Sequence, residues 1–430
     1  MTSAWWRDYH DDELTRLVEA ALVANQSIAE AAANYRLAQA TVAASVASLY
    51  PTVSAGFSGS RAESTTGTVS GTQTVISTNL SASWEPDLWG EVRREIESSK
   101  ARAQASDATL AGERLSIAAS VATDYFGLRQ ADIDIDYLKQ EIDLDTRLLA
   151  MTQAGFAVGT SSNDDLLTAE DTLELEVADL QTTQTAREQD EHAIAVLTGV
   201  PPGSFTIVPR REYAFAALAV PLVLPSELLE RRYDVVNAER TAASANAKIG
   251  EAKAAFFPTL DLSAEVGFQH NALANLFSLP NRFWSVGPSL AETLFDGGSR
   301  SAAVAEARAT YDADVASYRG TVLSAFQSVE DSLSSCNHLR EEAEAYASIL
   351  RRNQSLFDSE HAQYTVGTAS EQNLLTQQLI LLQAAQNLKD TQASLMTSTV
   401  TLIENLGGGW QWDDKKGAAI SNPIETPEIK

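Results

Sequence analysis

Residues that usually carry catalytic chemistry are sparse and scattered in this sequence. None of the five histidines has the His-Glu-x-x-His spacing of a zinc site or another paired metal-ligand spacing. Glu191-His192 and Glu360-His361 fall within helical patterns and are typical of solvated helix faces. Cys336 is the only cysteine, which excludes a disulfide framework and a cysteine-rich metal site. The Gly297-Gly298 pair lacks phosphate-loop spacing and fits a strand-to-helix bend. The sequence therefore predicts neither an enzyme active site nor a cofactor.

Two short turns carry the more informative side chains. Each interrupts a long helical pattern with the same three residues, and the following helix begins with acidic or polar residues. The turns are Val158-Gly159-Thr160 and Val366-Gly367-Thr368, and the polar residues are Asp164 and Asp165 after the first, and Glu371, Gln372, Asn373 and Thr376 after the second. Acids are favoured at helix N-termini, and glycine relieves left-handed strain in a helix turn. Taken alone, these residues fit ordinary helix ends.

The elements that position these turns occur twice along the chain. Pro51 and Pro258 are 207 positions apart, as are Gly90 and Gly297, and the two Val-Gly-Thr motifs are 208 apart. Motifs repeated with one internal spacing indicate a duplication. We therefore predict one structural repeat over 1–207 and a second over 208–406, each with a helix, strand, loop, strand, very long helix, turn and helix.

Short segments of alternating hydrophobicity predict strands at 50–59, 74–85, 258–269 and 283–294. In the first, Val53, Ala55 and Phe57 alternate with polar residues, as expected for a strand with one apolar face. A polar loop is expected from Ser58 to Thr74, and the strands fall within two β parts, 50–90 and 257–297. Four strands cannot close a barrel, and an open sheet has bare edges. The strands must therefore combine with other copies of the chain or pack on something else.

Helical patterns fill most of the remaining sequence. The first helix follows Asp11-Asp12-Glu13 and is expected to continue to Leu49, before the stop at Tyr50-Pro51. Further helices are predicted at 91–153, 163–197, 298–360 and 370–405. Some 60 helical residues would extend on the order of 90 Å. Residues 199–225 read as a non-helical connector and 407–430 as an irregular tail.

Composition narrows the possible partners and the route across a membrane. The 430 residues include 31 Lys and Arg against 58 Asp and Glu, a net charge of -27, so phosphate backbones would be repelled and nucleic-acid binding is not expected. No run of about 18 apolar residues predicts a transmembrane helix, so a crossing would require strands. The start at Met1-Thr2-Ser3-Ala4-Trp5-Trp6 does not resemble a secretory signal. We expect either a cytoplasmic protein or one whose signal is absent from this chain.

The order of several motifs resembles that of a known family. The resemblance covers nearly the whole chain, and the motifs that carry it are Trp5-Trp6 with Leu14, Leu17 and Ala21-Leu22, Trp84-Glu85 through Trp89-Gly90, Arg232-Tyr233-Asp234-Val235, Ala255-Phe256-Phe257-Pro258 and Leu294-Phe295-Asp296-Gly297-Gly298. The chain resembles the TolC-like outer membrane factors, closest to the OprM or NodT-type subfamily of resistance-nodulation-division (RND) efflux systems. Tyr233 departs from the family, which usually has proline there, and we expect this to alter only a helix start.

This resemblance implies a mainly α fold with membrane β structure. Four strands from each subunit of a homotrimer would form a 12-stranded β-barrel in the outer-membrane lipid of a Gram-negative bacterium, continued by a long periplasmic α-barrel. The chain would then be the passive exit duct of a tripartite efflux pump, with a periplasmic adaptor protein and an inner-membrane RND transporter as partners. Four aromatic residues are candidates for the membrane interface, with core packing as the alternative: Trp84, Trp89, Phe283 and Trp284. Subfamily members often bear a lipid on an N-terminal cysteine that precedes the segment corresponding to Trp5-Trp6.

The resemblance also assigns roles to the two turns. Val158-Gly159-Thr160 and Val366-Gly367-Thr368 would be the periplasmic tips that meet the adaptor. Seven acidic or polar residues near the turns would line a periplasmic gate: Asp164, Asp165, Tyr364, Glu371, Gln372, Asn373 and Thr376. In a homotrimer, three copies of an acidic residue would form a ring that attracts cations. Asp165 and Tyr364 match two members of a helix-to-helix lock in TolC. Asn373 and Thr376 stand where TolC has aspartates, and Ala369 replaces the arginine of that lock, so the latch is expected to be weaker or differently made.

Three other interpretations remain open. A type I secretion duct would share the architecture, and only the subfamily resemblance favours efflux. A non-membrane helical scaffold would use the strands to cap a bundle, but the paired strands with polar loops argue against it. An enzyme within a helical domain would need convergent polar residues, which the sequence does not reveal.

Overall fold

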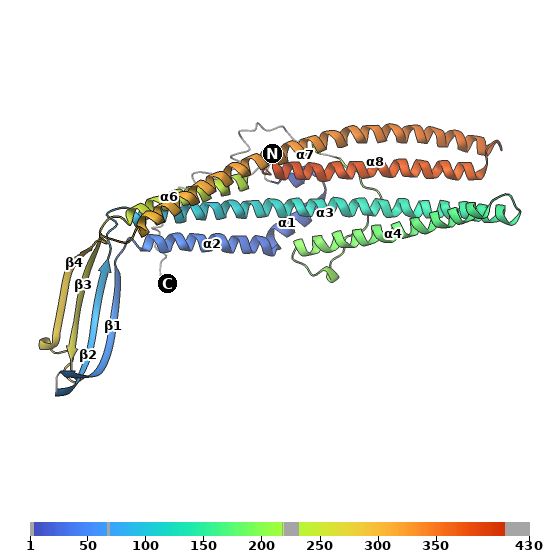
Figure 1. Ribbon diagram of the computed structural model, residues 1–430. Helices are drawn as coiled ribbons and strands as arrows, with labels where there is room; N and C mark the ends of the chain where they lie inside the picture. The colour runs from blue at the N-terminus through green and yellow to red at the C-terminus, as the bar shows by residue number, and fades with distance from the viewer. Residues whose placement is uncertain (1–3, 67–68, 217, 219–231, 409–430) are drawn as a thin grey trace. The chain divides into compact units, whose positions relative to one another are not determined.

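The computed structural model is mostly helical and contains one small sheet (Figure 1). It describes residues 4–66, 69–216, 218 and 232–408. Parts of the predicted connector (217 and 219–225) and of the predicted tail (409–430) lie outside the described residues, as do residues 226–231. The elements in chain order are η1 (Trp5–Tyr9), α1 (Asp12–Ala24), α2 (Gln26–Ala47), β1 (Thr52–Thr66), β2 (Val69–Trp84), α3 (Glu91–Ala157), α4 (Asn163–Leu197), η2 (Pro202–Ser204), α6 (Tyr233–Ala254), β3 (Thr259–His270), η3 (Leu279–Asn281), β4 (Arg282–Ala291), α7 (Ser299–Thr365) and α8 (Glu371–Asn405).

The chain forms two compact units that cut across the predicted repeats. For the residues that the structure describes, one comprises 1–32, 108–236 and 321–412, and the other comprises 33–107 and 237–320. Each unit draws segments from both predicted repeats because α3 and α7 pass from one unit into the other. The division into structural repeats over 1–207 and 208–406 stays a prediction.

The two long helices, α3 and α7, have 67 residues each, on the order of 100 Å at ~1.5 Å per residue. Both extend a turn or more beyond the predicted ends at 153 and 360. Residues 154–157 and 361–365 continue the helices because the glycine that ends each lies further along, at Gly159 and Gly367. Both hairpins, α3 with α4 and α7 with α8, are visible in Figure 1.

The expectation of one helix from the first acids to Leu49 is wrong. Asn25 separates α1 from α2, because its backbone is extended, with φ -65° and ψ 133°. Its side-chain Oδ1 accepts hydrogen bonds from the backbone N–H groups of Ser27 (2.9 Å) and Ile28 (3.2 Å), which caps the start of α2. Asn25 therefore ends one helix and begins the next within a single residue.

The sheet is a four-stranded antiparallel meander in the order β1-β2-β3-β4. β1 and β2 pair without interruption from Thr52↔Ser83 to Thr66↔Val69, so the polar loop expected between Ser58 and Thr74 is mostly strand. Serines at alternate positions pair across the two strands through their hydroxyls: Ser54 Oγ and Ser58 Oγ lie 2.8 Å from Ser81 Oγ and Ser77 Oγ, respectively.

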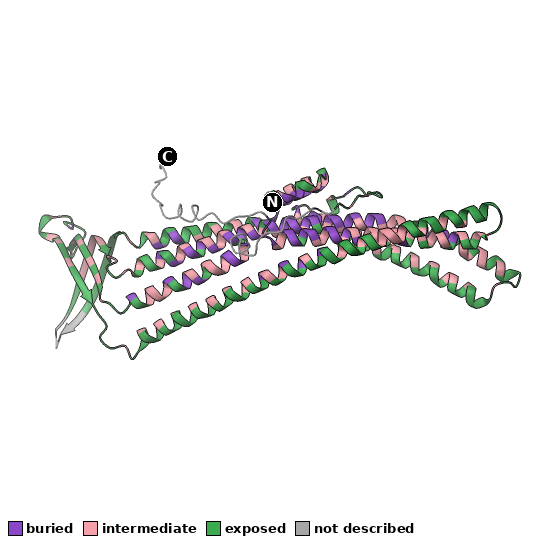
Figure 2. Ribbon diagram, turned by 90° about the horizontal axis from the view of Figure 1, so that it is seen from above, coloured by how far each residue is buried: buried purple, intermediate pink, exposed green. Residues whose placement is uncertain are grey.

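The core of the unit built from 1–32, 108–236 and 321–412 lies around α1 and the middle of α3. Leu14, Leu17 and Val18 of α1 are fully buried, as are Tyr125 and Phe126 of α3. Figure 2 shows buried residues concentrated in this region of the helices, whereas the strands are mostly exposed or intermediate. In the other unit, α3 and α6 approach closely through small residues, with Ser98 Oγ 2.8 Å from Ser244 Oγ.

Tyr233, the departure from the family's usual proline, begins α6 and packs on α3. Its ring covers Gly112, where an added Cβ would lie 2.2 Å from Tyr233 Cδ2. The sequence alone suggested only an altered helix start. The structure shows in addition a close ring-to-backbone contact that requires glycine on α3.

Candidate functional site

The first Val-Gly-Thr turn closes α3 in a complete C-cap. Gly159 has φ 81°, its N–H donates to Phe156 O at 3.1 Å, and the N–H of Thr160 donates to Gly155 O at 2.8 Å. These two bonds form a Schellman motif, which requires a left-handed residue at the position of Gly159. The second turn repeats the pattern: Gly367 has φ 80°, its N–H donates to Tyr364 O at 3.0 Å, and Thr368 N–H donates to Gln363 O at 2.9 Å.

Both turns expose an apolar side chain. Val158 and Val366 are each 75% exposed, although neither turn needs an apolar residue at that point to complete its backbone hydrogen bonds. The two turns thus present equivalent exposed valines.

The first predicted gate residues lie at the start of α4. Ser162 and Asp165 form a reciprocal capping box: Ser162 Oγ accepts from Asp165 N–H (3.0 Å), and Asp165 Oδ2 accepts from Ser162 N–H (2.8 Å). These hydrogen bonds lower the pKa of the exposed Asp165 carboxyl. Asp164 lies beside it, and its carbonyl accepts from Thr168 Oγ1 at 2.7 Å.

Tyr364 is partly exposed near the end of α7. Within the described ranges, no hydrogen bond joins Asp165 to Tyr364, and their part in a lock stays a prediction. The only side-chain partner that the structure gives Asp165 is Ser162 of its own capping box.

At the start of α8, Glu371 has a partner that sequence reasoning missed. Arg147 of α3 donates from Nη2 to Glu371 Oε1 at 2.7 Å, and the two side chains are 49% and 38% exposed. This ion pair joins the α3–α4 hairpin to the α7–α8 hairpin. The residues lie 224 positions apart, so no local pattern could have revealed it.

The other residues at this helix start make local contacts. Ser370 Oγ accepts from Asn373 N–H at 3.2 Å, and Thr376 Oγ1 donates to Gln372 O at 2.8 Å. Asn373 and Gln372 therefore lie in the first turn of α8, as predicted, but their roles in a gate stay a prediction.

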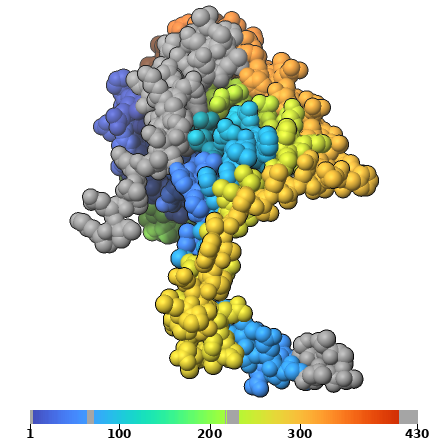
Figure 3. Space-filling model, turned by 90° about the vertical axis from the view of Figure 1, so that its left-hand side faces the viewer, coloured from blue at the N-terminus to red at the C-terminus, as the bar shows by residue number. Residues whose placement is uncertain are grey.

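The two faces of the sheet differ in chemistry. The β pairing places Val53 beside Ala82, Leu80 beside Val266, and Val266 beside Trp284, so apolar side chains form one continuous face. The opposite face is polar: Asn79 Nδ2 donates to Glu265 Oε1 at 2.7 Å, and Ser83 Oγ donates to Asp261 Oδ1 at 3.2 Å. In Figure 3, none of the described helical segments of the sheet's own unit (33–107 and 237–320) covers the visible side of β3 and β4.

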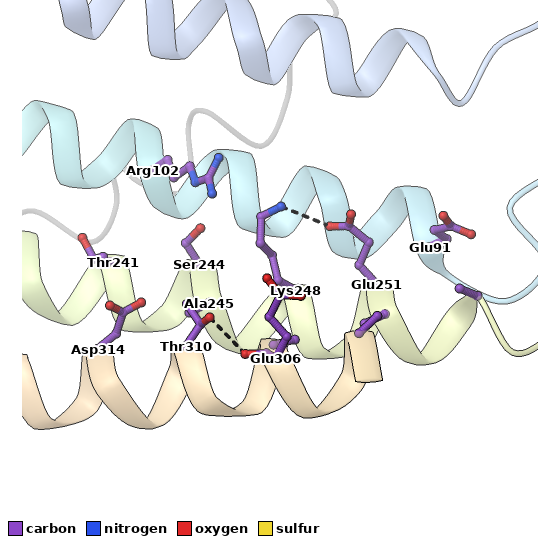
Figure 4. A pocket seen from close by; sticks show the side chains of 14 residues that line it. Glu91, Arg102, Thr241, Ser244, Ala245, Lys248, Glu251, Glu306, Thr310 and Asp314 are labelled. Carbon is purple, nitrogen blue, oxygen red and sulfur yellow. Dashed lines mark hydrogen bonds and ion pairs between the residues drawn. The ribbon is translucent and has the colours of Figure 1, made fainter. Parts of the chain in front are cut away.

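A groove lies between α3, α6 and α7. This groove of about 430 Å³ is lined by several alanines and by charged side chains that include Arg102, Lys248, Glu251 and Asp314 (Figure 4). Lys248 Nζ lies 3.8 Å from Glu251 Oε2. The charges of the lining partly cancel, and no arrangement of nucleophile, base and acceptor is formed there.

No helix in the described ranges is both long enough and apolar enough to cross a lipid bilayer.

Comparison with known proteins identifies the class of protein that this fold and these surfaces define. The model of the family "Outer membrane efflux protein" matches residues 17–200 and 224–408, so the chain belongs to this family. The match confirms the resemblance to TolC-like outer membrane factors.

The individual relatives agree with this assignment. Over 431 aligned residues the chain is 31% identical to the probable efflux pump outer membrane protein TtgC of Pseudomonas putida, covering 99% of this chain and 88% of that protein. It is 30% identical to the solvent efflux pump outer membrane protein SrpC of Pseudomonas putida, over 94% of this chain and 86% of the relative. Among solved structures, the outer-membrane channel OprN matches with a TM-score of 0.86 and 29% identity, over 96% of this chain and 94% of that chain.

The chain is therefore an outer-membrane efflux channel of Gram-negative type, the exit duct of a tripartite pump. Its fold is the predicted one, mainly α with a β domain, and members of this family are channel proteins.

Proposed function

We propose that three copies of the chain join their sheets into one closed 12-stranded barrel, through which small solutes leave the cell passively. The observation that carries this proposal is the sheet: β1 and β4 are its outer strands, each paired on one side only among the described elements. An unpaired strand edge is costly in lipid, and closure by neighbouring copies satisfies it.

The chemistry of the two faces supports the same arrangement. A membrane barrel turns apolar side chains to lipid and polar side chains to a water-filled lumen. Here Trp284 and Val286 are 67% and 71% exposed on the apolar face, whereas Asp261 and Glu265 lie on the opposite face. Outer-membrane lipid is thus the partner of one face, and permeating solutes are the partners of the other.

The proposed periplasmic partners meet the two Val-Gly-Thr tips. Exposed Val158 and Val366 would pack against hairpins of an adaptor protein, which links the duct to an inner-membrane RND transporter. The proposal assigns the acidic and polar residues beyond the tips, from Asp164 and Glu371 onwards, to a closable periplasmic end. The Arg147–Glu371 ion pair supports this assignment because it ties two hairpins together near that end.

The test compares two arginine substitutions on opposite faces of β4. Val286→Arg places a charge on the apolar face and is expected to oppose membrane insertion by about 2–4 kcal/mol near the bilayer midplane. Gly287→Arg is the matched control: an added Cβ there meets no atom within 4 Å, and the residue lies on the polar face.

The measurements are the mass of the detergent-purified complex and its conductance in planar bilayers. We expect a trimer that conducts in the unsubstituted and Gly287→Arg proteins, with far fewer insertions for Val286→Arg. A monomeric particle without conductance, or equal insertion by both variants, would contradict the proposed barrel.

A further inference from the structure

A pair of aspartates joins α3 to α8 midway along the two hairpins. Asp134 and Gln130 are four residues apart on α3, and Asp390 and Gln386 are four residues apart on α8. The amides reach across: Gln130 Nε2 donates to Asp390 Oδ1 at 3.1 Å, and Gln386 Nε2 donates to Asp134 Oδ1 at 3.4 Å. Each helix thus offers one donor and one carboxyl to the other.

The crossed amides hold the two half-buried carboxyl groups within hydrogen-bonding reach of each other. Two ionised carboxylates at that separation repel, whereas one shared proton converts the repulsion into a short charge-assisted hydrogen bond. Burial, followed by the charge and hydrogen bond of Asp390, raises the pKa of Asp134 to about 7, and burial also raises the pKa of Asp390.

The surrounding charges do not neutralise the pair. On α3, the Tyr137 phenol is close enough to feel the charge of both aspartates, and Glu141 adds negative charge. Glu176 of α4 in turn acts on Glu141. Lys389, beside Asp390 on α8, donates to the carbonyl of Tyr213 in the connector at 3.2 Å. Arg211 of the connector lies 3.5 Å from Asp136. The nearby cations are thus engaged by other groups, and the added acids favour retention of a proton.

We propose that Asp134 and Asp390 share one proton across the α3–α8 contact, which makes the attachment of the α7–α8 hairpin to the α3–α4 hairpin pH dependent. This inference deepens the proposed function, since movement of one hairpin against the other would widen the duct. The link is strongest when a proton is shared and weakens as pH rises through the range in which the pair loses it.

The direction in which pH changes the opening of the α3–α8 contact follows from proton linkage. When the helices separate, both carboxyls return towards the ordinary aspartate pKa of 3.8, so separation releases a proton at pH values between 3.8 and about 7. Release of one proton allows the opening equilibrium to rise by up to about tenfold per pH unit within that window. Above about pH 7, this pair no longer makes the opening equilibrium depend on pH.

Hydrogen–deuterium exchange of the detergent-solubilised full chain tests the link without any need for channel activity. Exchange of peptides that contain residues 386–394 is measured from pH 5 to pH 7.5 and corrected for the intrinsic pH dependence of amide exchange. We expect opening of this part of α8 to increase at least about tenfold from pH 5 to pH 7. Failure of the proposed barrel would leave this result unaffected, so the two proposals fail separately.

Asp390→Asn is the decisive variant, because an asparagine amide donates to the Asp134 carboxylate at every pH. It is expected to remove the pH dependence and keep exchange slow, and Asp134→Asn tests the same proton from the other helix if the first variant does not fold. Asp143→Asn, at an exposed position of α3, is the matched control and retains the wild-type profile. A wild-type pH profile in the Asp390→Asn or Asp134→Asn protein would overturn the proposal.

Discussion

At the scale of single residues, the ion pair between Arg147 and Glu371 is the most informative contact of the predicted gate. It connects the two hairpins near their tips through partly exposed side chains. Such a pair contributes little to folding, on the order of 0–1 kcal/mol, because water competes for both groups. Its value would lie in holding one arrangement of the hairpins over another.

We predict that Arg147→Ala increases single-channel conductance without loss of folding stability. Removal of the guanidinium frees Glu371 and releases the only ion pair that the structure describes between α3 and α8. Arg7→Ala removes an ion pair of similar exposure, with Glu19, away from the turns and serves as control. Equal conductance of the Arg147→Ala and wild-type channels would show that this contact does not hold the duct closed.

At the scale of elements, a buried ion-pair network attaches the connector to α3 and α4. Asp132 accepts from Arg129 Nη1 (2.8 Å) and Arg187 Nε (2.6 Å), and also from the backbone N–H of Arg210 (2.9 Å). The same two arginines donate to the carbonyls of Val208 and Ile207, each at 2.8 Å. Side chains of two helices thus hold a segment that has no regular hydrogen-bonded partner of its own.

Asp132→Ala is therefore expected to destabilise the protein strongly. It removes the carboxylate that Arg129 and Arg187 share, at a cost on the order of 3 kcal/mol for the lost charged hydrogen bonds. Arg129 keeps its ion pair with Glu13 and Arg187 keeps its ion pair with Glu191. Thermal unfolding followed by circular dichroism measures the loss. The matched control is Arg211→Ala, whose side chain is 79% exposed, and we expect a change within about 0.5 kcal/mol. Similar unfolding temperatures for the two variants would contradict the role given to Asp132.

The tips form a second element-scale prediction. Val158→Asp and Val366→Asp together are expected to abolish pump-dependent solute resistance in cells while the purified channel still forms and conducts. The Schellman bonds are made by backbone groups, so a charge at these exposed positions disturbs the partner surface and not the turn. The double threonine variant is the isosteric control. Full resistance in cells that carry the aspartate variant would place the adaptor elsewhere.

At the scale of the whole molecule, half-buried carboxyls make the helical unit sensitive to pH. Burial and the charge of Asp190 raise the pKa of Asp124 to about 6, and burial raises the pKa of Asp190 itself to about 6. Burial, together with the charges of Glu176 and Asp145, raises the pKa of Glu141 to about 7. The folded state therefore holds protons that the unfolded chain releases.

Stability is expected to decrease as pH rises from about 4 to 7 and to level off above that range. Each raised carboxyl costs on the order of 1 kcal/mol at pH 8 once its partial exposure is discounted. Asp190→Asn is expected to raise the unfolding temperature at pH 8 and to leave it nearly unchanged at pH 4. Unfolding scans across this range provide the check, and a destabilised variant at pH 8 would mean that the Asp190 charge is needed.

Local patterns in the sequence were sufficient to predict much of the architecture. Period-two alternation such as Val53, Ala55, Phe57 predicts strands, and proline-free helical patterns predict long helices, because both depend on neighbours within a few positions. The C-cap glycines Gly159 and Gly367 were recognisable for the same reason. The polar loop between β1 and β2 was predicted too long, because serine and threonine fit both a loop and a wet strand face.

Tertiary structure alone decided which distant side chains meet. The contacts that matter join residues tens or hundreds of positions apart: Arg147 with Glu371, Asp134 with Asp390, and Asp132 with the connector. Their geometry depends on how each helix is rotated against its neighbour. A single sequence carries no signal for that rotation. The sequence by itself determined that this chain builds long hairpins and a sheet with one apolar and one polar face. The packing of those hairpins determined where charges are paired, where protons are retained and where the duct can be held closed.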